Sequence, residues 1–307
     1  ASAPAGRSGV RLVARAPRVP GLDPPPRRIG AREFDFQRRV AVMAVVNRTP
    51  DSFHDQGATF ALDRAVAASL RAVELGADWV DVGGVPFGRG PSVSVAKALA
   101  AQIAERALAR VVPLVAAVAA ASDVVISVDT TSAVVAGAAV AAGASVVNDT
   151  SGFWDPDMPA AVAESGASVV LTHSLHPPRS EPVKPVYDDV VDVVRAFLGE
   201  RIERALGAGI PGDRLIVDPG HDLNKNTLHS LELIRRLGDI VDLGYPTLVA
   251  LSNKDFIGET IDRPQRERLH GSLAAAVACV IAGARLVRVH EVGPTVDAVR
   301  TAEAALG

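Results

Sequence analysis

The sequence predicts a single (β/α)8 barrel, the TIM-barrel fold, on three observations. Short Val- and Ile-rich runs alternate with Ala-rich stretches of helical spacing from residue 40 onward. Gly-Ala recurs just before an apolar run, in "LGADWVDVGG", "AAGASVVNDT", "ESGASVVLTH" and "IAGARLVRVHEV", where the glycine suits a helix C-terminus. The length of 307 residues is sufficient for one barrel of this kind.

Eight apolar runs are the predicted strands, and each precedes a stretch suited to a helix. Continuous apolar runs are typical of parallel strands, which are buried on both faces. The runs cover residues 40–47, 79–83, 124–129, 145–149, 168–173, 214–218, 246–252 and 286–291. The Pro-rich segment 174–185 is predicted to be a long loop after the fifth strand. A doubly wound open sheet is the alternative, but it requires a glycine-rich phosphate fingerprint after the first strand, which is not there.

The chain divides into two regions of different composition. Residues 1–30 are rich in Ala, Pro, Gly and Arg and show no recurring apolar face, so we predict a disordered basic arm. Residues 31–307 are predicted to be the barrel. The arm lacks the apolar segment of a secretory signal. A solvated tail is preferred to a tail that contacts an acidic partner.

Bulk composition argues against some classes of partner. The net charge of −3 and the aromatic content of 4% provide no footprint for nucleic acid. No stretch of about 20 apolar residues predicts a membrane span. Cys279 is the single cysteine, so a disulfide within the chain is impossible. Because Cys279 lies in an apolar helical stretch, we predict a core residue and a cytoplasmic protein.

Polar side chains occur at the C-terminal end of every predicted strand. In a (β/α)8 barrel these ends meet on one face, where active sites lie. A charge at a buried strand end is costly without a partner, so a charged or amide group at all eight ends favours a ligand site over a structural ion pair. The groups are Asn47, Asp81, Asp129, Asn148, His173, Asp218, Ser252 with Lys254, and Arg288 with His290.

The motif "RVHE" in the last predicted strand indicates an anion site. Residues two apart on a strand point to the same side, so Arg288 and His290 share a face. If that face lines the lumen, the two side chains form a cationic clamp. The alternative is an arginine that caps a helix and a histidine in the core.

Six short motifs follow one another along the predicted units: "VMAVVNRTPDSFHDQG", "ISVDT", "VVNDTSG", "IVDPG", "LSNKDFIG" and "LVRVHEV". Each is weak alone, but six in order on eight units form a specific pattern. Over about residues 40–300 the chain resembles the dihydropteroate synthases, the pterin-binding barrels of folate biosynthesis.

The resemblance implies a reaction and its participants. In that family the amine of p-aminobenzoate displaces pyrophosphate from 6-hydroxymethyl-7,8-dihydropterin diphosphate, usually with Mg2+. The implied partner is therefore a small-molecule pterin, with no nucleic acid and no membrane. The family is commonly dimeric through its last helices, which implies a homodimer, and the apolar face of residues 271–283 permits one.

The resemblance also assigns roles, position by position. Residues implied to be catalytic are Lys254, Arg288 and His290. The pterin is implied to contact Asp129, Asn148, Asp218 and Lys254. The diphosphate is implied to contact Asn47, Arg288 and His290, and the metal ligand is Asn47. On the p-aminobenzoate side the implied residues are Ser252 and Phe53.

Two loops depart from the family pattern. In the second loop the family's Glu-Ser-Thr-Arg after Gly-Gly is missing, and the chain continues with Val85, Pro86, Phe87 and Gly88. The sixth loop reads "DPGHDLNK", so Asp222 and Asn224 replace glycines and Leu223 replaces a phenylalanine. The Asp222 side chain is expected either to intrude on the pterin pocket or to add an acceptor there. Asparagine tolerates a positive φ, so the backbone shape is expected to survive at Asn224.

Three functions therefore remain open from the sequence. The first is a dihydropteroate synthase. The second is a weak or inactive paralogue that binds a pterin or its diphosphate without transfer to p-aminobenzoate. The third is a pterin-barrel methyltransferase, which the predicted anion clamp disfavours because methyl transfer involves no diphosphate.

Overall fold

A computed structural model describes residues 26–47, 61–83, 97–175 and 186–306 of the chain. Most of the predicted arm, Phe53, Val85 to Gly88 and most of the predicted 174–185 loop lie outside these ranges. All eight strands of the barrel are within them.

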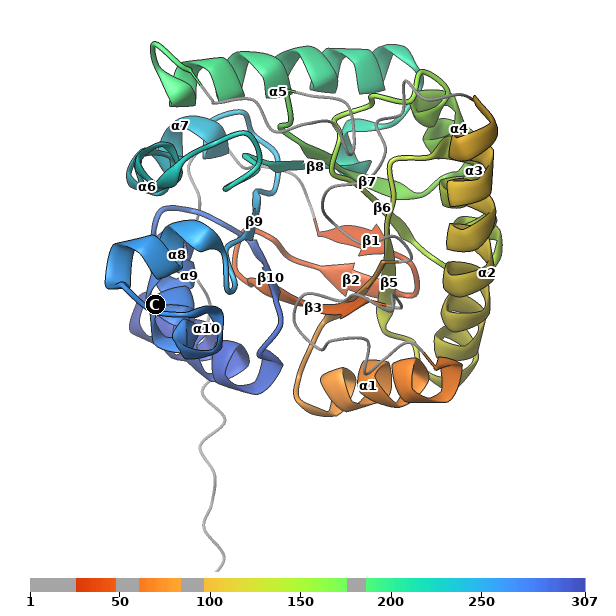
Figure 1. Ribbon diagram of the computed structural model, residues 1–307, viewed down its shortest axis with the longest axis horizontal. Coiled ribbons are helices and arrows are strands. Elements are labelled where there is room, and N and C mark those ends of the chain that lie inside the picture. Colours follow the sequence, from red (N-terminus) through yellow and green to blue (C-terminus); the bar gives the residue numbers. More distant parts are fainter. Residues whose placement is uncertain (1–25, 48–60, 84–96, 176–185, 307) are drawn as a thin grey trace, which may run out of the picture.

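The eight predicted strands form one parallel sheet that curves into a barrel (Figure 1). Its order is β8-β7-β6-β5-β4-β3-β10-β9, as expected for a chain that winds in one direction around the barrel. The strands are β3 (Ala41–Asn47), β4 (Trp79–Gly83), β5 (Val125–Asp129), β6 (Val146–Asp149), β7 (Ser168–Thr172), β8 (Leu215–Asp218), β9 (Leu248–Ala250) and β10 (Leu286–Val289). The predicted fold class is confirmed.

One strand is much shorter than predicted. The run 246–252 contains only the three residues of β9. Pro246 has no N–H to donate to a neighbouring strand, and the chain turns after β9, where the Lys254 N–H donates to the Leu251 carbonyl at 3.2 Å.

The described helices form a ring outside the strands (Figure 1). They are α1 (Leu62–Glu74), α2 (Lys97–Ala121), α3 (Ala133–Ala141), α4 (Met158–Ser165), α5 (Val190–Gly207), α6 (Thr227–Arg235), α7 (Leu237–Val241), α8 (Asp255–Ile261), α9 (Leu269–Ile281) and α10 (Val292–Leu306), with short 3-10 turns at Gly212–Arg214 and Gln265–Glu267. Cys279 in α9 is fully buried, and burial raises the pKa of its thiol to about 12, so its prediction as a core residue is confirmed. No helix in the described ranges is long and apolar enough to cross a membrane.

A short hairpin precedes the barrel and corrects the predicted arm boundary. Strand β1 (Arg27–Ile29) pairs antiparallel with β2 (Arg32–Phe34), so the predicted disorder does not extend to residue 30. The buried Arg27 guanidinium donates to the Leu215 carbonyl at 2.7 Å, at the start of β8. Phe34 packs edge-on against Trp79, with 5.6 Å between ring centroids. The hairpin therefore contacts the N-terminal ends of strands, opposite the predicted site.

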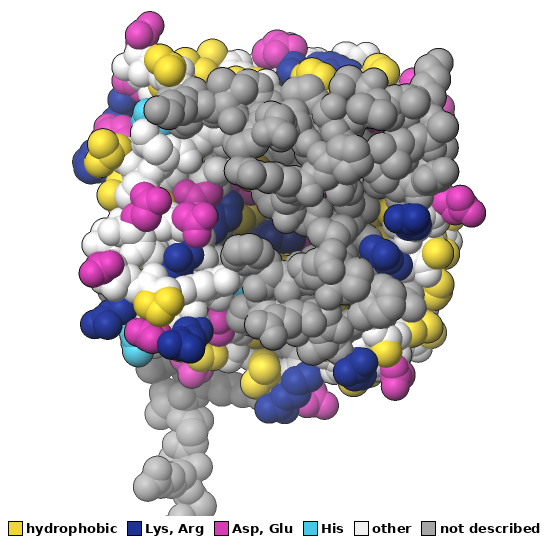
Figure 2. Space-filling view, in the orientation of Figure 1, with side chains coloured by type: hydrophobic (Ala, Val, Ile, Leu, Met, Phe, Trp, Pro, Cys, Tyr) yellow, Lys and Arg dark blue, Asp and Glu magenta, His cyan; other side chains and the backbone are white. Residues whose placement is uncertain are grey.

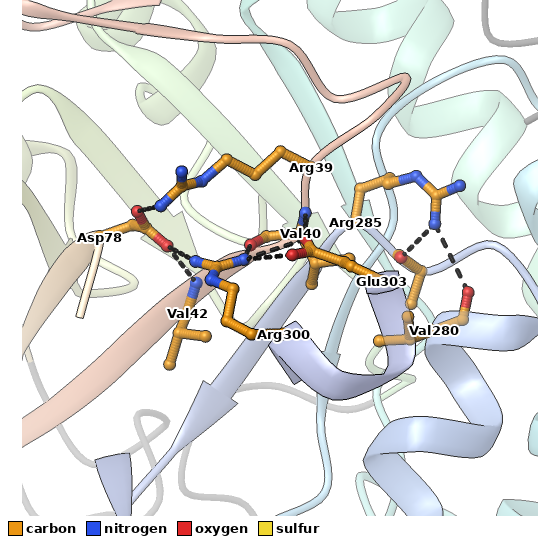
Figure 3. Close-up of polar contacts among 9 residues, drawn as sticks. Arg39, Val40, Val42, Asp78, Val280, Arg285, Arg300 and Glu303 are labelled. Carbon is orange, nitrogen blue, oxygen red and sulfur yellow. Dashed lines mark hydrogen bonds and ion pairs between the residues drawn. The ribbon is translucent and has the colours of Figure 1, made fainter. Parts of the chain in front are cut away.

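An ion-pair network on this same end joins α10 to the first strands (Figure 3). The buried Asp78 carboxylate, just before β4, accepts from Arg300 and from the Val42 N–H, both at 3.0 Å. Glu303 accepts from the Val40 N–H at 2.7 Å and from Arg300 at 2.9 Å. The last helix is thereby held to the start of β3 and β4.

The barrel closes between β8 and β9 through few backbone contacts. Within the described ranges, these neighbours share one isolated bridge between Val217 and Thr247. The Val217 N–H also donates to the Pro246 carbonyl at 3.0 Å. The short β9 leaves this seam with less pairing than the four- and five-residue ladders elsewhere in the sheet.

Candidate active site

The predicted site residues gather at the C-terminal end of the barrel, because parallel strands place those ends on one face. Figure 2 shows acidic and basic side chains interspersed on the face viewed, with basic side chains near its centre. The described side chains at the strand ends are Asn47 on β3, Asp129 on β5, Asn148 on β6, Asp218 on β8 and Arg288 on β10. Lys254 directly precedes α8, and His290 directly follows β10.

Arg288 pairs across the lumen with two carboxylates. Its Nε lies 2.6 Å from Asp81 Oδ2, and its Nη2 lies 2.9 Å from Asp129 Oδ2. Arg288 therefore faces the lumen. The alternative interpretation of this motif, an arginine that caps a helix, is wrong for Arg288. Its predicted contact with a diphosphate remains a prediction.

Asp81, a strand-end group that received no role from the sequence, contacts two of the residues that did. Its side chain is fully buried, and Oδ2 also accepts from Asn148 Nδ2 at 3.1 Å. Asn148 Oδ1 is buried with no hydrogen-bond partner among the described residues. One carboxylate thus contacts both a predicted pterin-binding residue and a predicted diphosphate-binding residue.

Both carboxylates assigned to the pterin have raised pKa values. Burial raises the pKa of Asp129 to about 7; the Arg288 guanidinium opposes this shift, and the carboxylates of Asp81 and Asp149 add to it. Burial also raises the pKa of Asp218, although the Lys254 charge acts against it. Asp218 Oδ1 accepts from the Gly220 N–H at 2.7 Å, which fixes the start of the sixth loop.

Lys254 reaches from the end of the β9 loop into the sixth loop. Its Nζ donates to the His221 carbonyl. Burial lowers the pKa of Lys254, and the carboxylates of Asp222 and Asp218 oppose this shift. The ammonium is therefore near the predicted pterin acceptor Asp218.

The Asp222 carboxylate contacts the start of a helix. Asp222 Oδ2 accepts from the N–H groups of Asp255 and Phe256, the first two residues of α8, at 2.8 and 3.4 Å. Ser230 Oγ lies 3.3 Å from Asp222 Oδ1. Asp222 has a φ of 63°, a conformation that the family's glycine adopts without strain. The added acceptor serves the protein's own backbone.

Asn224 ties the sixth loop to the fifth. Its φ of 53° is positive, as expected for a position where the family has glycine. Asn224 Oδ1 accepts from the Leu175 N–H at 2.9 Å and from Ser174 Oγ at 3.2 Å. The Tyr187 hydroxyl donates to the Asn224 carbonyl at 2.7 Å.

His173 and Lys225 form a buried pair below this loop. Lys225 Nζ lies 2.8 Å from His173 Nδ1 and donates to the carbonyls of Gly220 and Leu223, each at 2.9 Å. Burial and the Lys225 charge lower the pKa of His173 to about 2, so the ring is neutral. His173, predicted at a strand end, thus supports the loop from within the core.

Ser252 lies between His290 and an acidic side chain that carried no predicted role. Ser252 Oγ donates to Glu291 Oε2 at 3.2 Å and lies 3.1 Å from His290 Nδ1. Glu291 Oε1 also accepts from Asn253 Nδ2 at 2.9 Å. Asn253, where the family has arginine, has a φ of 61°. The p-aminobenzoate contact of Ser252 remains a prediction.

The metal predicted at Asn47 would have few protein ligands. Among the described residues there is no group of three or more His, Cys, Asp or Glu side chains placed to hold an ion. Asn47 Oδ1 lies directly over Gly83, where a Cβ would collide with it. A single amide oxygen fits Mg2+, which commonly keeps several waters and binds through substrate phosphates.

The fold and site together define a class of barrel protein that carries carboxylates, an amide and a lysine at the C-terminal ends of its strands. The sequence profile of a family described as pterin binding enzyme matches residues 43–290. The chain belongs to this family.

Relatives and solved structures support the same assignment. Inactive dihydropteroate synthase 2 of Mycobacterium tuberculosis is 43% identical over 263 residues, 84% of this chain and 80% of that protein. Dihydropteroate synthase of Escherichia coli is 38% identical over 266 residues, 86% of this chain and 91% of that protein. Dihydropteroate synthase from Xanthomonas albilineans, solved in complex with 7,8-dihydropteroate, is 38% identical with a TM-score of 0.79, and the match covers 92% of this chain and 98% of that one.

Proposed function

We propose that the chain binds 6-hydroxymethyl-7,8-dihydropterin diphosphate in the barrel lumen and transfers its pterin to p-aminobenzoate weakly or not at all. The observation that carries the binding is the set of acceptors at the C-terminal ends of three strands. Asp129 ends β5, Asn148 lies one residue before the end of β6 and Asp218 ends β8, and their side chains suit the N–H donors of a pterin edge. The buried Oδ1 of Asn148, which has no partner within the described ranges, supports this, because an incoming donor would satisfy it.

The diphosphate would be held at the mouth of the same lumen. Arg288 and Lys254 supply positive charge there, and His290 lies beside Ser252. Mg2+ bound through Asn47 would neutralise part of the charge on the diphosphate. A ligand with these phosphates competes with Asp129 for the Arg288 guanidinium.

The complete synthase reaction is the second candidate function. It forms a bond from the p-aminobenzoate nitrogen to the pterin methylene carbon, breaks the carbon–oxygen bond to pyrophosphate, and releases an amine proton. Since pyrophosphate leaves readily once its charge is held, electrostatic stabilisation would supply most of the catalysis. The presence of Lys254, Arg288 and His290 at the mouth favours this candidate.

Weak or absent transfer is favoured by the residues around that machinery. Asn253 replaces the family's arginine and is bound to Glu291, and the second loop lacks the family's Thr-Arg pair. Inactive dihydropteroate synthase 2 of Mycobacterium tuberculosis shares 43% identity with this chain, whereas the dihydropteroate synthase of Escherichia coli shares 38%.

Two measurements test the proposal. The pterin diphosphate should raise the unfolding temperature, and p-aminobenzoate should add little to that shift. No shift with the diphosphate would remove the pterin site. Release of pyrophosphate in the presence of both substrates should be at or near background, and Lys254→Ala is the control. Robust turnover that disappears in Lys254→Ala would establish the synthase instead.

The assembly state and cellular location are also proposals. A homodimer through the last helices and a cytoplasmic location follow from the family resemblance and the single buried cysteine. Sedimentation of the purified chain would give twice the monomer mass of 31.8 kDa for a dimer.

A further inference from the structure

We propose that Asp81 is a positioning residue for the pterin subsite, which fixes the amide orientation of Asn148 and the location of Arg288. This inference rests on the proposed pterin-binding function. Asp81 acts through the two side chains that it contacts, Arg288 and Asn148.

The contacts of Asp81 are unusually constrained. Its side chain is fully buried on β4, and its Oδ2 accepts from Arg288 Nε at 2.6 Å and from Asn148 Nδ2 at 3.1 Å. Asn148 comes from β6 and Arg288 from β10, so three strands meet at one oxygen atom. Two donors on one buried oxygen restrict the Asp81 side chain more than a single donor would.

This contact determines which atom Asn148 presents. A carboxylate oxygen beside a guanidinium only accepts hydrogen bonds, so the Nδ2 group of the amide must face Asp81. Asn148 Oδ1 then faces away, and it is buried with no partner in the described part of the chain. The subsite therefore offers an oriented acceptor, which selects a heterocycle edge that donates through N–H.

Asp81 also determines where Arg288 lies. With Nε on Asp81, the guanidinium places Nη2 2.9 Å from Asp129 Oδ2. Asp129, one of the two carboxylates assigned to the pterin, is thus bound to the same arginine. Removal of the Asp81 charge would release both Asn148 and Arg288, whereas loss of either partner alone would leave the other in place.

Asp78 is a matched control. It lies just before β4, it is also buried, and it also pairs with an arginine from the C-terminal part of the chain, Arg300 at 3.0 Å. Its partners Arg39, Val42 and Arg300 (Figure 3) include the start of β3, at the end of the barrel opposite the proposed subsite. Asp78→Asn therefore perturbs a comparable buried pair without a contact to the proposed subsite.

The test is an exchange of the two side chains. Dissociation constants for 6-hydroxymethyl-7,8-dihydropterin, without phosphates, are measured for Asp81→Asn, Asn148→Asp and the double variant. Each single change should weaken binding roughly tenfold or more, because one loses the charge-assisted contact and the other opposes two carboxylates. The double variant restores an amide donor against a carboxylate and leaves an oxygen for the ligand. Its affinity should exceed that of both single variants but stay below that of the wild type, because Arg288 no longer faces a carboxylate at position 81.

The outcomes separate the role of Asp81 from the proposed function. If the wild type does not bind the dihydropterin, the proposed function is wrong and the positioning role falls with it. The second case is that the wild type and Asp78→Asn bind the dihydropterin equally well. If Asp81→Asn then also binds as the wild type does, only the positioning role is wrong. The same conclusion follows if the double variant binds no better than the single variants.

A measurement on the wild type covers the case in which Asp81→Asn does not fold. In protein labelled with 15N-asparagine, the Asn148 side-chain amide should exchange slowly with solvent, free and with the dihydropterin bound. Fast exchange in the free protein would mean that Asp81 does not hold the amide, and would overturn the inference.

Discussion

Asp222 Oδ2 lies 2.8 Å from the backbone nitrogen of Asp255, across 33 positions of sequence. The residue that replaces a family glycine therefore caps the helix that begins just after Lys254. The departure couples the sixth loop to the segment that carries the lysine, and leaves the Asp222 carboxylate engaged by the protein's own backbone.

Asp222→Ala should lower the free energy of unfolding by about 2 kcal/mol from the lost cap, because alanine keeps the strain that Asp222 already bears at positive φ. Asp222→Gly loses the same cap but relieves the strain, so it should cost about 1 kcal/mol. Urea denaturation of both variants provides the measurement. Equal losses for alanine and glycine would mean that the φ of 63° carries no strain.

Binding of the dihydropterin should depend on pH through Asp129. Its pKa of about 7 is above the ordinary value of 3.8, so the carboxylate that accepts from the ligand is present above pH 7 and lost below it. Burial is the main cause; Arg288 opposes it, and Asp81 and Asp149 add to it. Affinity should fall by up to about tenfold per pH unit below 7.

The control for this pH dependence is Asp129→Asn, which should bind more weakly with a flat profile. A flat profile for the wild type between about pH 5 and 8 would contradict the assignment. The same raised pKa has the opposite sign for stability: the Asp129 contribution is present at acidic pH and is lost as pH rises through 7.

Asp78→Asn should destabilise the barrel by about 2–3 kcal/mol, because the Arg300 guanidinium then keeps Glu303 as its one described carboxylate partner and the contact to Val42 is weakened. Thermal and urea unfolding would report the loss. An unchanged midpoint would show that the network contributes little to holding α10 against the strands.

Glu291→Gln should cost about 1–2 kcal/mol, because glutamine cannot accept from Ser252 and Asn253 through both of its terminal atoms. Glu267→Gln, at an exposed position in a 3-10 turn, is the comparison and should change stability little. Both variants make the same glutamate-to-glutamine change, at two sites that differ in the exposure and the hydrogen-bond partners of the side chain. A similar midpoint for both would remove the bridging role of Glu291.

The strands were predictable because buried parallel strands need continuous apolar runs, and polar residues mark their ends. The run at 79–83 matches β4 in full, and Asp129, Asn148 and Asp218 fall at strand ends as expected. The short length of β9 was not predicted, because the apolar residues after Pro246 have the composition of a longer strand and nothing in them marks the turn that follows Ala250.

Pairings across the lumen could not be predicted. The sequence places Asp81 at a strand end, but its contact with Arg288 depends on the stagger of strands that are 207 positions apart in sequence. The Asp222 cap is similarly non-local. The hairpin at Arg27–Phe34 was hidden in a basic, proline-rich segment, because its few apolar residues are stabilised by Trp79 and by strand ends far along the chain.

The sparse pairing between β8 and β9 has a thermodynamic consequence. Asp218 ends β8 and Lys254 follows β9, so the two proposed pterin contacts belong to opposite sides of that seam. A ligand held by both residues would link the two sides of the least hydrogen-bonded junction of the sheet. Occupancy would then slow amide exchange at Val217 more than at the well-paired strands, and the ligand would become a structural component of the closed barrel.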